Sequence, residues 1–368
     1  MRNIPWSADV QLDAHYRPLP STIGAPPSCY TDPVGLGYLP PNMPCRYLIT
    51  GVAGFIGSAL ASALIEQGHA VRGIDNFATG KRENLSRAPG IDFLEADLND
   101  PAAVRTACRG VEVVFHEAAI PSVPRSVADP VASNHANVNG TVNLLVAARD
   151  AGVRRLVYAG SSSAYGNSPN LPKREDFLPA PLSPYAVAKL AGEHYLAAFH
   201  ACYGLETVTL RYFNVFGPFQ DAASAYAAVL AKFITCMLHG EVPTVHGNGE
   251  QSRDFTYIDN VVAGNLLAAT APAASVAGQV INCATGARIT LNQVIELLRP
   301  MLGYDGEVRY GPSRPGDVTH SLADISRART LLGYEPKVNF AEGLARTVAW
   351  YRSLEPALSQ PASHPARP

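Results

Sequence analysis

Tyr185 and Lys189 are four residues apart, in a stretch that begins after Ser183-Pro184 and has the pattern of an amphipathic helix. Residues at this spacing lie one turn apart on one face of a helix. The pair stands out because the chain has 16 Tyr but five Lys. A neighbouring ammonium favours the phenolate, so it lowers a tyrosine pKa that is ordinarily about 10. We therefore expect Tyr185 to act as a general base toward a hydroxyl.

Three serines, Ser161-Ser162-Ser163, follow the short β-like run Arg155–Ala159. Ligands of open α/β sheets bind at the carboxyl ends of the strands, so these serines are expected to lie where Tyr185 can reach a substrate. Ser161 could hold the substrate hydroxyl or relay its proton. The expected chemistry is hydride transfer with NAD as the oxidant, and the expected catalytic residues are Ser161, Tyr185 and Lys189. The oxidised nicotinamide ring, like the ammonium of Lys189, is expected to favour the Tyr185 phenolate.

A glycine-rich loop, Thr50-Gly51-Val52-Ala53-Gly54-Phe55-Ile56-Gly57, joins a β-like run to a helical stretch. Its G-x-x-G-x-x-G spacing allows the backbone to approach a pyrophosphate at the helix N-terminus. A second β-like run ends at Asp75, 24 residues after Gly51, where a carboxylate can accept from both ribose hydroxyls and repels a 2′-phosphate. The loop predicts an NAD site, although nearby basic residues leave NADP open: Arg72, Lys81 and Arg82.

These motifs resemble the extended short-chain dehydrogenase/reductase family and, within it, the NAD-dependent nucleotide-sugar epimerases. The resemblance spans about residues 45–354 and includes further motifs: Asp97-Leu98, Ala118-Ala119, Arg211-Tyr212-Phe213-Asn214-Val215-Phe216-Gly217, Ser252-Arg253-Asp254-Phe255 and Arg314-Pro315-Gly316-Asp317. The run Ser122-Val123-Pro124-Arg125-Ser126 and the small residue Ser321 resemble bacterial UDP-N-acetylglucosamine 4-epimerases in particular.

The resemblance implies which residues bind the cofactor and which bind the substrate. It implies NAD contacts for Gly51, Gly54, Phe55, Ile56, Gly57, Asp75, Asn76, Asp97, Leu98, Ala119, Tyr185, Lys189 and Tyr212. It implies UDP-sugar contacts for Ser122, Ser162, Ser163, Asn214, Ala228, Val229, Arg253, Arg314, Asp317 and Ser321. Arginine suits a diphosphate because its planar fork donates two parallel hydrogen bonds, although a lone arginine more often belongs to a surface ion pair.

The residues after Ser161 favour one reaction of this family. Related 4,6-dehydratases and decarboxylases share the oxidation at C4 and place a carboxylate directly after the catalytic hydroxyl, whereas this chain has Ser162, Ser163 and Ala164. The interpretation is that the hydride returns to the opposite face of a 4-keto sugar, which is C4 epimerisation of UDP-N-acetylglucosamine and UDP-N-acetylgalactosamine. UDP-glucose or UDP-glucuronate remain alternatives, with Ser122 or Arg125 available to meet a C6 carboxylate. A non-catalytic NAD-binding regulator is disfavoured because Tyr185 and Lys189 are both present.

Repeated βα units are expected to position these residues. Strand-like runs alternate with helical stretches such as Phe55–Gln67, Val138–Ala151 and Pro184–Tyr203. This alternation predicts an α/β fold with a Rossmann-type doubly wound parallel sheet. After Gly217 the pattern is less regular, and helical 225–239 and 291–302 with the strand-like 278–282 predict a smaller C-terminal α/β substrate lobe.

The predicted domains follow these changes in pattern. Residues 1–44 are expected to form a Pro-rich arm with nine Pro, in which Met43 is a plausible translation start, and residues 355–368 a loose tail. Between them we expect an NAD-binding domain at 45–217 and a mainly nucleotide-sugar-binding lobe at 218–354. The chain can cross between these two lobes.

Composition excludes several classes of protein. The chain has 368 residues, of which 47% are hydrophobic and 16% are charged, and a formal net charge of -2, which argues against disorder, a nucleic-acid partner or a membrane-surface partner. No apolar run is long enough to span a membrane and no secretory signal is evident. Six Cys without a C-x-x-C pair favour reduced thiols over disulfides or a metal site, and a cytoplasmic location. Helical 127–151 and 184–203 resemble the dimer interface of the family, so a homodimer is expected.

Overall fold

The structure is a computed structural model that describes residues 46–221, 229–313 and 318–354. The predicted arm, Met43 and the tail therefore lie outside the described residues. The same holds for three predicted substrate contacts, which are Ala228, Arg314 and Asp317.

A seven-stranded parallel sheet forms the centre of the fold, in the order β11-β6-β5-β4-β1-β2-β3. The strands are β1 (Arg46–Thr50), β2 (Ala70–Asp75), β3 (Asp92–Glu95), β4 (Val113–His116), β5 (Arg155–Ser161), β6 (Glu206–Tyr212) and β11 (Gln279–Cys283). The order reverses between β1 and β4, and in such sheets ligands bind outside the carboxyl ends of the strands at that point. The predicted Rossmann-type fold is confirmed.

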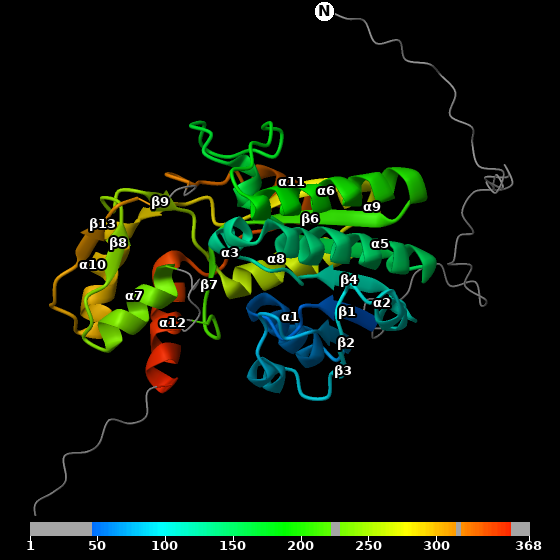
Figure 1. The fold of residues 1–368 in the computed structure, drawn as a ribbon, viewed down its shortest axis with the longest axis horizontal. Coiled ribbons are helices and arrows are strands. Elements are labelled where there is room, and N and C mark those ends of the chain that lie inside the picture. Colours follow the sequence, from blue (N-terminus) through cyan, green and yellow to red (C-terminus); the bar gives the residue numbers. More distant parts are fainter. Residues whose placement is uncertain (1–45, 222–228, 314–317, 355–368) are drawn as a thin grey trace, which may run out of the picture. The chain divides into compact units, whose positions relative to one another are not determined.

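Helices cover both faces of this sheet (Figure 1). Helices α1 (Phe55–Glu66) and α8 (Ile258–Thr270) pack on one face, and α2 (Pro101–Cys108), α5 (Gly140–Asp150) and α6 (Pro184–Tyr203) pack on the other. Successive side chains of a strand therefore enter different cores: Val113 and Phe115 join the core under α1 and α8, while Val114 joins the core under α2, α5 and α6. Because both faces are buried, the strands read as continuous apolar runs.

Short helical elements connect the strands and helices of the sheet domain. They are η1 (Arg82–Arg87), α3 (Val123–Ala128), α4 (Pro130–Asn134), η2 (His135–Asn139), η3 (Ser162–Tyr165), α9 (Ala273–Val276) and α11 (Ser326–Leu332). Asp129 caps α4 by accepting the Ala132 N–H at 2.9 Å and Pro130 begins that helix, so the helical stretch predicted at 127–151 is broken after α3.

A second hydrophobic core lies under the helices α7 (Val229–Leu238), α10 (Leu291–Leu302) and α12 (Phe340–Leu354). Three small strand pairs accompany it. They join β7 (Val215–Phe216) to β10 (Thr256–Tyr257), β8 (Thr244–His246) to β13 (Arg309–Gly311), and β9 (Ser252–Arg253) to β12 (Ile289–Thr290).

One strand assignment made from the sequence was wrong. The run 278–282 was expected in the smaller lobe, but β11 pairs in parallel with β6, with Ile281 opposite Leu210, and extends the central sheet. The preceding α8 packs against β5 and β6. The reason is that the edge of β6 offers unpaired backbone groups and an apolar face, and local pattern cannot show which sheet a short strand joins. The division into domains stays a prediction.

A buried ion pair fastens α6 to the sheet. Arg211 of β6 donates through Nη2 to Oε1 of Glu193 at 2.6 Å and through Nε to Oε2 at 3.0 Å. The two side chains are 2% and 8% exposed. Such a pair fixes geometry because removal of one partner leaves an uncompensated buried charge. Since Glu193 lies on the helix that carries Tyr185 and Lys189, the pair sets the position of that helix.

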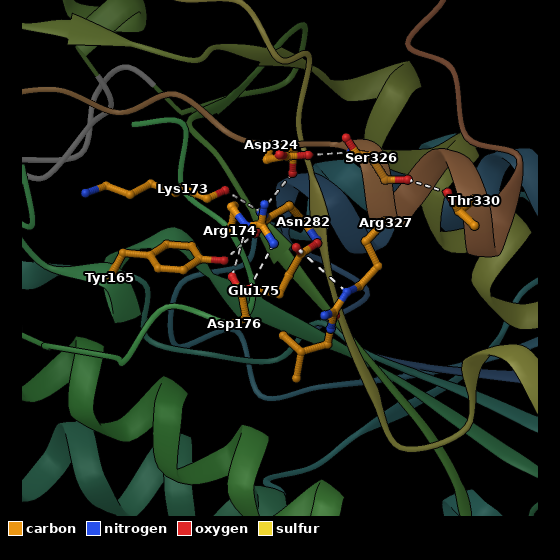
Figure 2. Close-up of polar contacts among 11 residues, drawn as sticks. Tyr165, Lys173, Arg174, Glu175, Asp176, Asn282, Asp324, Ser326, Arg327 and Thr330 are labelled. Carbon is orange, nitrogen blue, oxygen red and sulfur yellow. Dashed lines mark hydrogen bonds and ion pairs between the residues drawn. The ribbon is translucent and has the colours of Figure 1, made fainter. Parts of the chain in front are cut away.

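A polar network joins the segment after the serine run to β11 and to the chain before α11 (Figure 2). Asn282 is its centre: its Oδ1 accepts from Tyr165 Oη at 2.7 Å, and its Nδ2 donates to the carbonyls of Lys173 at 2.9 Å and Asp324 at 3.0 Å. Its N–H donates to the carboxylate of Glu175 at 2.8 Å. These bonds hold the segments that approach the cavity described below.

The state of the cysteines and the character of the helices bear on what composition predicts, namely reduced thiols and no membrane span. Cys108, Cys202, Cys236 and Cys283 are free thiols, and Cys108 and Cys283 are buried. Of the helices in the described ranges, none has both the length and the apolar character that crossing a membrane requires.

Glu193→Ala is expected to lower the free energy of unfolding by about 3–5 kcal/mol, because it leaves the Arg211 guanidinium buried without its partner. Urea unfolding followed by circular dichroism measures the change. The matched control is Glu335→Ala, which breaks the exposed Arg329–Glu335 pair and should cost about 0–1 kcal/mol. Equal effects of the two substitutions would contradict the assigned role.

Candidate active site

A cavity of about 1160 Å³ opens at the carboxyl edge of the sheet. This volume exceeds the range of about 300–1,000 Å³ that is common for a single small ligand. Its walls come from the glycine loop, the ends of β2, β4, β5 and β6, the start of α6, and residues near 214, 253 and 321.

The glycine loop presents bare backbone to the cavity. Gly51 has φ +69°, and a Cβ there would lie 2.7 Å from the backbone of Ala118. A Cβ on Gly57 would lie 2.2 Å from the carbonyl oxygen of Gly51. Gly54 is the N-cap of helix α1 and supplies no capping side chain, so the first amide groups of the helix remain available to an anion. The loop fits a pyrophosphate.

Asp75, at the end of β2, is held by backbone amides. Its Oδ2 accepts the Ala53 N–H at 2.9 Å and its Oδ1 accepts the Phe77 N–H at 2.8 Å. Burial raises the pKa of this carboxyl, and the amide hydrogen bonds oppose the rise. A carboxylate has about four lone-pair sites, so Asp75 can also accept from ribose hydroxyls, and the residues present fit NAD.

The structure brings the predicted cofactor residues together. The cavity is lined by Gly51, Gly54, Phe55, Ile56, Gly57, Asp75, Asn76, Asp97, Leu98, Ala119, Tyr185, Lys189 and Tyr212. Of the predicted substrate residues it is lined by Ser122, Ser162, Ser163, Asn214, Arg253 and Ser321. Val229 is half-buried at the start of α7 and does not belong to the described lining. The ligand contacts of these residues stay predictions.

Ser161, Tyr185 and Lys189 converge at the ends of β5 and α6. Ser161 forms a hydrogen bond with Tyr185, and its Oγ lies 2.8 Å from the Oγ of Ser163. Lys189 is 4% exposed and donates through Nζ to the carbonyl of Ala159 at 2.9 Å. Ser183 is the N-cap of helix α6 and accepts the Ala186 N–H at 3.2 Å, which fixes where the helix begins and so where Tyr185 lies.

The expected lowering of the Tyr185 pKa is not produced by the protein alone. Burial raises the pKa of Tyr185 to about 12, the hydrogen bond with Ser161 opposes the rise, and the charge of Glu117 adds to it. Burial also lowers the pKa of Lys189 to about 8, with Glu117 opposing. An enclosed phenol loses the water that would stabilise its anion. Of the two expected causes of a lower Tyr185 pKa, the Lys189 ammonium and an oxidised nicotinamide ring, the second is the one that the ligand-free protein lacks.

Sequence reasoning missed Glu117 as a residue of the site. No carboxylate was expected beside the catalytic serine, yet Glu117 follows β4 directly, is half-buried and lines the cavity. Its Oε1 accepts a hydrogen bond from Tyr212 Oη at 2.8 Å. The available signal was an acidic residue immediately after a buried strand, beside the motif Ala118-Ala119.

The substrate end of the cavity contains a small side chain. Ser321 is 7% exposed, and its Oγ accepts from Asn214 Nδ2 at 3.2 Å and from the Asp254 N–H at 3.3 Å. Arg253, also in the wall, donates through Nη1 to the carbonyls of Ser252 and Thr319 at 3.0 Å each. The cavity thus combines a nucleotide-sized volume, a glycine loop that fits an anion and the phenol that is expected to transfer a proton.

Residues 47–284 match the model of the NAD dependent epimerase/dehydratase family. The chain belongs to this family. It is 40% identical to a UDP-glucose 4-epimerase of Mycolicibacterium smegmatis over 84% of its own length and 99% of that protein. It resembles the crystal structure of a UDP-N-acetylglucosamine 4-epimerase from Methanobrevibacter ruminantium in complex with UDP-N-acetylmuramic acid, with 41% identity, a TM-score of 0.80, and coverage of 85% of this chain and 100% of that one.

A third relative has a bound cofactor. This UDP-glucuronic acid 4-epimerase from Bacillus cereus was solved with UDP-glucuronic acid and NAD; it is 34% identical with a TM-score of 0.79, over 84% of this chain and 100% of that one. The comparisons confirm the resemblance found in the sequence, the NAD dependence and the assignment of the chain as an enzyme of the epimerase class.

Tyr185→Phe is expected to lower turnover roughly 10²–10⁴-fold, the usual contribution of a positioned proton-transfer group. Binding of NAD should change little, because the substitution removes one hydroxyl. Steady-state kinetics and NAD titration measure both. Tyr310→Phe, at an exposed position of β13 outside the described cavity lining, is the control and should keep wild-type turnover. Near-normal turnover of Tyr185→Phe would show that another group is the base.

Proposed function

We propose that this enzyme interconverts UDP-N-acetylglucosamine and UDP-N-acetylgalactosamine by epimerisation at C4. The observation that carries the choice of sugar is the small, buried Ser321 in the wall of the cavity beside Asn214. A serine leaves room for an acetamide when the 4-keto sugar turns between its two orientations. A larger side chain would fill that volume, and a close-packed site cannot relieve such a clash cheaply. The relative from Methanobrevibacter ruminantium supports the same choice.

The described residues divide the reaction among them. Bound NAD supplies the acceptor that takes the hydride from C4 and later returns it. Tyr185 accepts the C4 hydroxyl proton as the hydride leaves, and Ser161, hydrogen-bonded to it, orients the hydroxyl oxygen. Lys189 adds a positive charge at the buried end of α6. When the keto sugar has turned, the hydride returns to the opposite face of C4 and the same phenol donates its proton back to the C4 oxygen.

A UDP-glucuronate 4-epimerase is the second candidate. Arg125, in α3, and Lys173, which pairs with Ala323, both line the cavity and could meet a C6 carboxylate. The relative from Bacillus cereus supports this alternative. Lys173 donates to the carbonyl of Ser168, so a carboxylate would compete with that bond.

We also propose that the enzyme is a homodimer joined through α3, α4 and α6. Large apolar side chains on these helices are exposed in the single chain: Val127 is 64%, Val131 is 77% and Val187 is 52% exposed, and Tyr195 on α6 is 42% exposed. Apolar surface grouped on adjacent helices is typical of an isologous interface, in which each subunit offers the same patch.

Ser321→Tyr is expected to suppress turnover of the two N-acetyl sugars while sparing UDP-glucose and UDP-galactose, if the wild type uses them. The reason is steric, because the phenol occupies the acetamide volume. Initial rates of both sugar pairs on both proteins measure the effect. Ser313→Tyr, in a described loop away from the cavity lining, controls for a general effect of the added ring. An unchanged preference, or a wild type active on a uronic acid alone, would contradict the N-acetyl assignment.

Val131→Asp combined with Val187→Asp is expected to convert the dimer to a monomer, because each subunit would bury two unpaired charges in the interface. Sedimentation velocity at several concentrations measures the mass. A control with Val242→Asp, an equally apolar exposed side chain that is 42% exposed before β8, should leave the mass unchanged. A wild type that sediments as a monomer would contradict the proposal.

A further inference from the structure

Glu117 is a charged group that the proposed proton transfer does not use, although it lies in the wall of the same cavity. It follows β4, between the glycine loop and the serine run. A Cβ on Gly51 would lie 3.0 Å from the backbone carbon of Glu117. The cavity wall on both sides of it contains Ala118, Ser161 and Tyr185.

A hydrogen-bonded chain holds the carboxylate in place. Tyr212 Oη donates to Glu117 Oε1 at 2.8 Å and accepts from Asn265 Nδ2 at 2.7 Å. Asn265, on α8, is held by a bond to the carbonyl of Val261 at 2.9 Å. Burial raises the pKa of Tyr212 well above its usual value, so this phenol remains a neutral donor. Glu117 is therefore fixed by two other elements of the fold, β6 and α8.

Other titratable groups face Glu117 from the surrounding elements. They are Tyr158 on β5, Tyr185 and Lys189 on α6, Tyr212 on β6 and Cys283 at the end of β11. Burial raises the pKa of Glu117 to about 7, and Tyr212 and the Lys189 charge oppose the rise. The ammonium of Lys189 and the hydrogen bond from Tyr212 thus keep the carboxyl close to ionisation in a place where burial disfavours it.

The place of Glu117 follows from what the reaction needs. A hydride acceptor anchored on the Gly51 loop has to reach the sugar carbon held at Ser161 and Tyr185, and Glu117 lines the cavity between these two points. Oxidised nicotinamide carries a positive charge that the reduced ring lacks. A negative group in this wall stabilises the oxidised form relative to the reduced form.

We propose that the Glu117 carboxylate sets the redox balance of the bound cofactor by favouring its oxidised form. Glu117 transfers no proton or electron. An epimerase must release its product with the cofactor oxidised, so a group that disfavours trapped reduced cofactor protects each cycle. The same charge has a disadvantage at Tyr185. It raises the pKa of this phenol and so makes its phenolate harder to form.

The test is a reductive titration of the holoenzyme without sugar, in which absorbance gives the ratio of reduced to oxidised bound cofactor at each potential. Glu117→Gln should raise that ratio about 10- to 100-fold at pH 7, as expected for loss of a nearby charge in a medium of effective dielectric about 20. Each tenfold change corresponds to about 30 mV for a two-electron couple.

Glu175→Gln is the matched control. Glu175 is another carboxyl whose pKa is raised by burial, but it binds the Asn282 N–H in the network of Figure 2 and does not line the described cavity. It should leave the ratio at the wild-type value. A ratio in Glu117→Gln that also equals the wild-type value would overturn the proposal.

Tyr212→Phe distinguishes charge from packing and replaces the first variant if Glu117→Gln does not fold. It keeps the carboxyl but removes the donor that favours ionisation, so the pKa of Glu117 should rise further. In Tyr212→Phe the ratio of reduced to oxidised bound cofactor should exceed that of the control Glu175→Gln at pH 7. At higher pH the Glu117 carboxyl ionises again, so the ratio should return toward the wild-type value. A ratio that matches the wild type at every pH would overturn the proposal. The inference rests on the proposed hydride-transfer site, but no sugar is present, so a wrong substrate assignment would leave these results unchanged.

Discussion

The buried pair between Arg211 and Glu193 is the interaction on which the geometry of the site depends. It fixes α6 against β6, and α6 carries the tyrosine and the lysine that must meet a serine at the end of β5. The Arg211 guanidinium also lies 4.6 Å from the ring centre of Tyr165, which binds Asn282 in the network of Figure 2. The buried guanidinium of Arg211 therefore links helix α6, the turn η3 that contains Tyr165, and the edge strand β11. If one of these elements moved, Arg211 or Glu193 would lose its partner, and an unpaired charge in the interior is strongly destabilising.

Burial has two opposed effects on the chemistry of this cavity. It protects a hydride-transfer site from water, but it also moves the pKa values away from those that catalysis needs, upward for the Tyr185 phenol and the Glu117 carboxyl and downward for the Lys189 ammonium. The protein supplies part of the compensation through Ser161 and Tyr212. The charge of a bound cofactor supplies more, which makes the acid–base strength of the empty site different from that of the loaded one.

Much of the site could be predicted because its parts have strong local signals. The glycine loop, Asp75 and the Tyr185–Lys189 spacing each report on a single turn or helix, and the cavity contains all of them. Glu117 had only a weak local signal, its position immediately after the buried strand β4. Its importance depends on Tyr212, 95 residues away in the chain, and on Asn265, which local patterns cannot bring together. The assignment of β11 failed for the same reason, since an edge strand is defined by its neighbour β6.

The sequence by itself determined the alternation of strands and helices, the glycine loop and the residues that we expect to carry out proton transfer. These follow from spacing over one or two turns, where steric and hydrogen-bonding rules act along the chain. Tertiary structure decided which charges are buried together, and hence the sign of the pKa shift at Tyr185 and the presence of the Glu117 carboxylate near it. Desolvation and charge coupling act through space, so they are set only when distant segments pack.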